Sequence, residues 1–244
     1  MKISFVIPAH NEEQYLGNCL TVLQVQIRKS RSSAEIIVVN NASTDNTKEI
    51  ASSFPGVKVI DEKHKGLARA RQAGFRASTG ELIANIDADS NVPTGWIETV
   101  EYEFATVPNL VVLSGPYVYY DLSSARNFLV RTYYYHAYVF YILHSYILRI
   151  GSMVQGGNFV VRREALERAG GYDQRFAFYG EDTDVARRFF PLGRVKFSFK
   201  LKMHTSGRRL VKEGFFRMGA RYGLNYFWTM WTAKPFTKSV KPHD

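Results

Sequence analysis

The chain of 244 residues has a single cysteine and no long run of one residue type. Because Cys19 stands alone, no disulfide can form within the chain, and we expect a reducing, cytosolic location. The strand-like residues 3–7 follow Met1 and Lys2 directly, so we expect no signal peptide. The sequence also lacks internal repeats and low-complexity linkers, which favours one main domain.

Positive charge is in excess, but it is scattered. The net charge is +10 and the pI is about 9.6, which fits binding to nucleic acid, to an anionic membrane surface or to phosphorylated substrates. The sequence has no long Lys/Arg tract and no zinc-finger or RNP-type signature, so we expect no nucleic-acid partner. With 45% apolar and 22% charged residues, the composition is that of an ordinary folded protein.

Strand-like and helix-like stretches alternate along the chain. Strands are expected at residues 3–7, 35–39, 57–60, 82–86, 109–114, 158–162 and 195–199. Helices are expected at residues 12–27, 45–53, 66–77, 96–104, 124–150, 163–168, 181–190 and 215–231. This order predicts an α/β fold with a mostly parallel sheet flanked by helices. The carboxyl ends of parallel strands meet at one edge, where ligands bind, so the polar loops that follow these strands should converge there.

Two carboxylates, Asp87 and Asp89, follow the apolar run at residues 82–86. They flank one small residue where a buried strand should emerge into a loop. Such a pair can hold a hard divalent cation through oxygen ligands, and that cation can hold a diphosphate. Acidic loops are common, so the pair gains weight only from its surroundings.

Five motifs in a fixed order supply those surroundings. They are residues 7–12 (IPAHNE), 37–47 (IVVNNASTDNT), 66–74 (GLARARQAG), 87–89 (DAD) and 180–184 (GEDTD). In this order and spacing, residues 3–190 resemble family 2 glycosyltransferases. The resemblance implies an inverting enzyme of the Rossmann-like GT-A fold that uses a nucleotide-diphosphate sugar.

The resemblance assigns nucleotide-binding roles to six positions. They are Pro8, Ala9, Glu12, Asn40, Arg71 and Asp87. The family usually has an aspartate at the position of Asn40, where it accepts a hydrogen bond from the base. An asparagine carbonyl accepts more weakly and without charge. UDP is therefore the nucleotide expected first, and GDP and dTDP stay open.

The resemblance also assigns a metal site and a catalytic base. Asp89 should contact Mg²⁺ or Mn²⁺, and His204 is a second candidate ligand. Asp182 should act as the general base that deprotonates the acceptor hydroxyl, with Glu181 contacting the acceptor or orienting the base. An acidic first turn of a helix would by itself explain the cluster at residues 181–184.

Four further positions are expected around the sugar. Gly157 and Asn158 should line the donor and acceptor pocket, because a small residue lets a sugar ring approach. Arg208 and Arg209 follow the last strand in an expected loop and could close over phosphate as a mobile clamp.

Aromatic residues gather in two stretches. Residues 132–148 carry no formal charge and include six tyrosines, while residues 215–231 form a second aromatic segment. The first stretch fits a helix lying in a membrane interface, a helix buried in the core or in a homodimer, or, least well, a membrane span. We expect residues 1–210 to form the catalytic domain, with helix 124–150 inserted in it. Residues 211–244 should form a C-terminal amphipathic helix and a tail.

These features together predict a metal-assisted transfer of one sugar. The acceptor would be a hydroxyl or a lipid-linked phosphate, and the chain would be cytoplasmic, with peripheral attachment to the inner membrane face open. A hexosyl or an N-acetylhexosaminyl group could be transferred. The alternative is a non-catalytic nucleotide-sugar-binding module with the same pocket.

Overall fold

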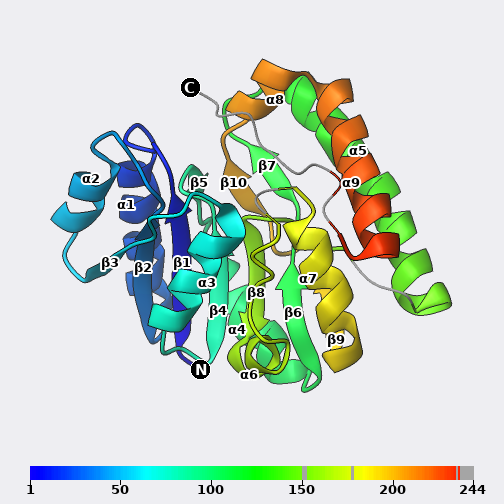
Figure 1. The fold of residues 1–244 in the computed structure, drawn as a ribbon, viewed down its shortest axis with the longest axis horizontal. Coiled ribbons are helices and arrows are strands. Elements are labelled where there is room, and N and C mark those ends of the chain that lie inside the picture. The colour runs from blue at the N-terminus through cyan, green and yellow to red at the C-terminus, as the bar shows by residue number, and fades with distance from the viewer. Residues whose placement is uncertain (150–152, 177–178, 235, 237–244) are drawn as a thin grey trace.

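A seven-stranded sheet forms the centre of the molecule in the computed structural model, which describes residues 1–149, 153–176, 179–234 and 236 (Figure 1). The strand order is β3-β2-β1-β4-β8-β6-β9. The strands are β1 (Ile3–Ala9), β2 (Ala34–Asn40), β3 (Val57–Asp61), β4 (Leu82–Ile86), β6 (Leu110–Ser114), β8 (Asn158–Arg162) and β9 (Arg194–Phe197). All are parallel except β8, which runs antiparallel between β4 and β6. The mostly parallel α/β fold is therefore confirmed.

Helices cover both faces of this sheet. Successive side chains of a strand point to opposite faces, so apolar strands present apolar side chains to both layers of helices. One face packs on α1 (Leu16–Ser30), α2 (Thr47–Ser53) and α4 (Trp96–Thr106), and Ile3, Phe5 and Ile7 of β1 point into this layer. The other face packs on α3 (Leu67–Ala77), α6 (Arg163–Arg168) and α7 (Glu181–Phe189). The short 3-10 helix η2 (Phe190–Leu192) follows α7.

A second, three-stranded sheet lies beyond the carboxyl ends of β4 and β6 (Figure 1). It consists of β5 (Ser90–Asn91), β10 (Met203–Thr205) and β7 (Tyr117–Tyr119), in that order. None of these strands was predicted, and the prediction of a loop at residues 204–209 was wrong. His204 lies in β10, and Arg208 begins α8 (Arg208–Glu213). Such short strands exist only through their pairing with distant segments, which local sequence does not reveal.

The aromatic stretches form two helices at one side of the molecule. These are α5 (Ser124–Ile142), which continues as the π-helical η1 (Leu143–Leu148), and α9 (Phe215–Thr232), and they lie beside each other (Figure 1). His144 Nδ1 and the Tyr226 hydroxyl, 2.8 Å apart, join them. In the described part of the chain, no helix is long and apolar enough to cross a membrane.

The expected domain boundary after residue 210 falls inside α8 and stays a prediction. The helix expected over residues 124–150 changes to π geometry at Leu143 and ends at Leu148. Residue 150 and, of the expected tail, residues 235 and 237–244 lie outside the described residues.

Close packing of α3 on the sheet gives a first prediction. A Cβ atom at Gly74 would lie 2.3 Å from Val6 Cγ1, so Gly74→Ala should lower the free energy of unfolding by about 1–3 kcal/mol through overpacking. Gly219→Ala in α9 is the matched control, because a Cβ atom there meets open space. This substitution should raise the free energy of unfolding by about 0.5–1 kcal/mol. Urea denaturation measures both changes. Equal effects of the two substitutions would contradict this account of the packing.

Candidate functional site

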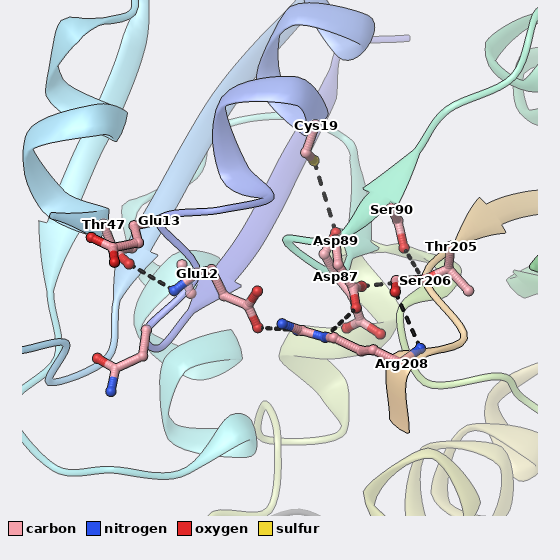
Figure 2. Close-up of polar contacts among 12 residues, drawn as sticks. Glu12, Glu13, Cys19, Thr47, Asp87, Asp89, Ser90, Thr205, Ser206 and Arg208 are labelled. Carbon is pink, nitrogen blue, oxygen red and sulfur yellow. Dashed lines mark hydrogen bonds and ion pairs between the residues drawn. The ribbon is translucent and has the colours of Figure 1, made fainter. Parts of the chain in front are cut away.

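The loops after β1 and β2 are tied together at the carboxyl edge of the sheet. The Glu12 amide donates to Thr47 Oγ1 at 2.8 Å (Figure 2), and Asn11 Oδ1 accepts from the Thr44 amide at 2.9 Å. Helix α1 begins only at Leu16, after this loop. Pro8 and Ala9 end β1 at the same edge, so both stay beside the expected nucleotide site.

Asn40, at the end of β2, is almost fully buried and already has protein partners. Its Nδ2 donates to Asp61 Oδ1 at 2.8 Å, and its Oδ1 accepts from the Ser43 amide at 3.3 Å. Asp61, at the end of β3, also pairs with Lys48 Nζ at 2.6 Å. Asp61 lies at the carboxyl edge, as expected for the polar loop that follows this strand, but its hydrogen bond with the Asn40 amide was not predicted.

Asp87, directly after β4, is held from three sides. The Tyr117 hydroxyl donates to its Oδ2 at 2.8 Å, and Arg71 Nη2 lies 3.6 Å from its Oδ1. A Cβ atom at Gly157 would lie 2.0 Å from the Asp87 Cγ, so only glycine fits there. The missing side chain at Gly157 therefore leaves room for the Asp87 carboxylate, while the expected place of Gly157 in the donor and acceptor pocket stays a prediction. Tyr117 is a partner of Asp87 that sequence patterns did not reveal.

Arg71 lies fully buried under the site. Its guanidinium group forms ion pairs with Asp87 and Glu181 and lies over the Phe159 ring at 5.1 Å. A direct contact with a nucleotide, as the family resemblance implied, would need exposed surface that Arg71 lacks. The structure instead places its charge where it links the carboxylates after β4 to those at the start of α7.

Glu181 and Asp182 form the first turn of α7 after Gly180. Burial raises the pKa of Glu181, and the Arg71 charge partly offsets this increase. Burial also raises the pKa of Asp182, against the hydrogen bond that the Thr183 amide donates to its Oδ1 at 2.7 Å. A raised pKa makes a carboxylate a stronger base near neutral pH. Asp184 faces away and pairs with Arg187 and Arg188 instead.

Asp89 is surrounded by hydrogen-bond and charge partners (Figure 2). Thr205 Oγ1 donates to its Oδ1 at 3.1 Å, and Arg208 Nε lies 3.2 Å from its Oδ2. Burial, together with the charge of Asp87, raises the pKa of Asp89 to about 7. A carboxyl group in this state is stabilised in its ionised form by a nearby cation.

The structure does not bring His204 to Asp89. His204 is exposed, whereas its neighbour Thr205 is buried and contacts Asp89. Side chains alternate along a strand, so successive residues of β10 point in opposite directions. Thr205 takes the place at Asp89 that was expected for His204.

Arg208 and Arg209 separate at the start of α8. Arg208 pairs with Glu12 Oε1 at 2.5 Å and with Asp89, and its guanidinium lies 4.4 Å from the centroid of the Tyr15 ring. Arg209 instead pairs with Glu213 Oε1 at 2.8 Å and lies over the ring of Tyr179. Arg208 therefore reaches the carboxylates at the strand ends, and Arg209 lies beside the segment that leads into α7.

The Asn158 side chain is fully buried. Its Nδ2 donates to the Leu201 carbonyl at 2.7 Å and to the Gly115 carbonyl at 2.9 Å. Its Oδ1 accepts from Trp96 Nε1 at 3.1 Å. The structure thus corrects the expected role: the Asn158 amide joins the backbone of two segments and the Trp96 side chain, because a buried amide needs a partner for each polar group.

The carboxylates form one connected line along the edge of the sheet. Arg71 pairs with both Asp87 and Glu181, so it joins the carboxylates after β4 to those at the start of α7; Asp89 is two residues after Asp87, and Asp182 follows Glu181. The backbone of Gly156 lies beside both carboxylates of α7, since a Cβ atom there would lie 3.1 Å from Glu181 Oε1 and 3.7 Å from Asp182 Oδ2. The two acidic motifs are thus linked through Arg71, while the expected cleft shared by Asp89 and Asp182 stays a prediction.

The donor atoms at Asp87 and Asp89 suit a hard divalent cation. Both side chains offer oxygen ligands, and the Arg208 guanidinium already acts as a cation between Asp89 and Glu12. Glu12 Oε2 is buried without a hydrogen-bond partner. Within the described residues, no group of three or more His, Cys, Asp or Glu side chains is arranged to hold a metal.

A separate cavity of about 680 Å³ lies between α3 and α7. Its lining includes Tyr172, Arg69, Arg175 and Arg188, but none of the carboxylates at Asp87, Asp89 and Asp182. The Tyr172 hydroxyl is bonded to the Asn85 amide at 2.8 Å, behind the line of carboxylates. The cavity is thus distinct from the candidate site.

The burial of Arg71 predicts a large effect on stability. Arg71→Met removes the cation and leaves Asp87 and Glu181 without their counter-charge, which should lower the free energy of unfolding by about 3–5 kcal/mol. The control is Arg76→Met on the same helix, where the side chain is exposed and the change should stay within about 0.5 kcal/mol. Chemical denaturation gives both values. A loss at Arg71 no larger than at Arg76 would refute the assigned ion-pair role.

Two bacterial relatives connect the sequence to known proteins. The chain is 33% identical over 135 residues to glycosyltransferase GlyG of Streptococcus pneumoniae, and the aligned region covers 53% of this chain and 44% of that protein. It is 27% identical over 207 residues to the probable glycosyltransferase YdaM of Bacillus subtilis, which covers 79% of this chain and 47% of that protein. The chain therefore spans less than half the length of both relatives.

Solved structures share the fold. Mannosyltransferase PcManGT from Pyrobaculum calidifontis, in complex with GDP-Man and Mn²⁺, matches with a TM-score of 0.67 and 21% identity, over 92% of this chain and 62% of that chain. Glucosyl-3-phosphoglycerate synthase from Mycobacterium tuberculosis, in complex with Mn²⁺ and UDP-Glc, matches with a TM-score of 0.62 and 17% identity, over 97% and 80%. The expected GT-A fold is thereby confirmed.

The match to a family model completes the comparison. Residues 4–170, more than half of the chain, match the model described as glycosyl transferase family 2. These residues include the loops after β1 and β2, Arg71, the two aspartates after β4 and Gly157. The chain belongs to glycosyltransferase family 2.

Proposed function

We propose that this chain transfers one sugar, with inversion, from a nucleotide-diphosphate sugar to a hydroxyl or lipid-phosphate acceptor. The observation that carries the proposal is the line of carboxylates from Asp89 and Asp87, through Arg71, to Glu181 and Asp182. Inversion needs one group for the leaving diphosphate and one base on the opposite face of the sugar. Asp89 and Asp182, at the two ends of this line, are the proposed groups.

Each residue has a proposed part in the reaction. Asp182 accepts the proton of the acceptor hydroxyl as its oxygen attacks the anomeric carbon, and Glu181, held by Arg71, orients the base or contacts the acceptor. Asp87 and Asp89 would hold Mg²⁺ or Mn²⁺, which when bound neutralises charge on the leaving diphosphate. The similar structures that contain Mn²⁺ support this assignment.

The nucleotide would lie over Pro8, Ala9 and Asn40 at the ends of β1 and β2. UDP is the first choice, supported by a Staphylococcus aureus TarS structure in complex with UDP-GlcNAc and by the structure that contains UDP-Glc. The structure that contains GDP-Man supports GDP as the second choice. The partly engaged Asn40 carbonyl is the proposed acceptor for the base, and the transferred sugar is a hexosyl or N-acetylhexosaminyl group.

Replacing the proposed base tests the reaction. A thermal-shift screen of UDP-, GDP- and dTDP-sugars with Mn²⁺ first identifies the donor. The Asp182→Asn variant should retain its affinity for this donor, because the amide keeps the shape of the side chain. Turnover should fall at least about 100-fold, since the general base is lost. Calorimetry and donor-hydrolysis assays give the two values.

Two outcomes would contradict the proposal. Full turnover in the Asp182→Asn variant would exclude Asp182 as the base. A wild-type protein that binds a donor with Mn²⁺ but never turns it over, with or without added acceptors, would instead support the non-catalytic binding module.

An exposed aromatic surface supports attachment to the cytoplasmic face of a membrane. We call it the aromatic platform, and it consists of Phe128, Leu129, Tyr135, Val139, Phe140, Tyr146 and Ile147 on α5 and η1, and Leu224, Phe227, Trp228 and Trp231 on α9. Val130, Tyr134 and Tyr141 on the other side of α5 pack into the protein. Residues 122–163 and 214–236 contain no Asp or Glu, so a basic and aromatic surface would face anionic lipid.

The acceptor would then arrive from the membrane side. Tyr133 of α5 and Tyr222 and Tyr226 of α9 are close enough to Asp182 for its charge to raise the pKa of each hydroxyl, on top of the larger effect of burial. Helix α9 also packs against α7, and a Cβ atom at Gly180, next to the first turn of α7, would contact Thr229 of α9, so α9 lies beside the helix that carries the proposed base. A lipid-linked acceptor held at the platform would lie on this side of the site.

Vesicle binding tests the aromatic platform. A triple variant, Leu224→Ser, Phe227→Ser and Trp231→Ser, removes one exposed stripe of α9 and should weaken binding to anionic vesicles at least about tenfold. Tyr102→Ser, on the exposed surface of α4, is the control and should bind like the wild type. Cosedimentation at low salt measures both. The membrane proposal would be overturned if the wild-type protein did not cosediment with anionic vesicles. It would also be overturned if size-exclusion chromatography showed a homodimer that buries the aromatic platform.

A further inference from the structure

Arg208 occupies the centre of the carboxylate cluster at the strand ends (Figure 2). Its Nη2 lies 2.5 Å from Glu12 Oε1, and its Nε lies 3.2 Å from Asp89 Oδ2. The guanidinium also lies over the Tyr15 ring. One side chain thus joins the loop after β1, the loop after β4 and the start of α8, across 196 positions of sequence between Glu12 and Arg208.

The backbone before Arg208 is anchored independently of these contacts. Asp121 accepts hydrogen bonds from the Ser206 hydroxyl and from the Gly207 amide, both at 2.6 Å. Thr205 stays bonded to Asp89 through β10. The side chain of Arg208 keeps about 40% of its surface exposed, so it can swing away from Asp89 without unfolding the segment that carries it.

A cation at Asp89 and the Arg208 guanidinium need the same oxygen atoms. Two positive groups cannot both neutralise Asp89 Oδ2 at contact distance, because like charges repel at close range in a site partly shielded from water. A diphosphate beside the cation changes this balance, since it offers a guanidinium group new oxygen partners with matching geometry. Arg208 then has a reason to leave Asp89 only when cation and diphosphate arrive together.

We propose that Arg208 is an internal competitor for the divalent cation at Asp89, and that it makes cation binding depend on the nucleotide diphosphate. Without a diphosphate, Arg208 neutralises Asp89 and Glu12 and keeps the cation site weak. With a diphosphate, Arg208 moves onto the phosphate oxygens and releases Asp89. This inference rests on the proposed donor site and adds a residue that sets the order in which that site fills.

The proposal predicts effects of opposite sign in one variant. In Arg208→Gln, Mn²⁺ alone should bind at least about fivefold more tightly than in the wild type, and UDP at saturating Mn²⁺ should bind at least about fivefold more weakly, within the usual range of coupling between sites. Electron paramagnetic resonance counts free Mn²⁺, and calorimetry measures UDP. A merely structural role would weaken both ligands together.

Lys212→Gln is the matched control. It removes the same charge from an exposed position of α8 and should leave both affinities within about twofold, which separates local competition from the general field of the protein. Unchanged or weaker Mn²⁺ binding in Arg208→Gln would overturn the inference. So would Mn²⁺ affinity below detection in both the wild type and the variant. The opposed shifts would uphold it even if sugar transfer failed, which would count against the proposed function alone.

Discussion

A buried cation holds the two halves of this site together. The Arg71 guanidinium lies without solvent contact between Asp87, which follows β4, and Glu181, which begins α7. Charges removed from water, as those of Arg71 and Glu181 are, are tolerated only when they are paired, so the Arg71 guanidinium fixes the positions of Glu181 and of the partly exposed Asp87. The donor side and the base side of the proposed reaction therefore share one rigid support beneath the carboxylates.

Above this support, negative charge is concentrated and incompletely neutralised. Asp87, Asp89 and Glu12 lie near one another, and their mutual repulsion adds to burial in raising the pKa values of Asp89 and Glu12. The Arg208 guanidinium relieves part of this repulsion through its ion pairs with Glu12 and Asp89. This concentration of carboxylates favours a nearby cation, and the partly exposed Arg208 side chain supplies one.

The sequence predicted what local patterns encode. Apolar runs gave the strands of the main sheet, and the polar residues after one of them gave Asp87 and Asp89. Glu181 and Asp182 were found through the resemblance to family 2 glycosyltransferases and begin α7. It could not give β5, β7 and β10, which exist through pairing between distant segments. Nor could spacing show that Arg71 is buried while Arg76 on the same helix is exposed, or that Asn158 bonds to backbone rather than to a ligand. Those outcomes depend on tertiary contacts.

The central claim is that Asp89 and Asp182 act on one bound donor from the two ends of a single site. The most direct measurement is a crystal structure of the protein with UDP and Mn²⁺. The account predicts the cation at Asp89, the diphosphate beside it, and open space for a sugar between the diphosphate and Asp182. A nucleotide bound elsewhere, for example in the cavity lined by Arg69 and Arg175, with no path to Asp182, would contradict it.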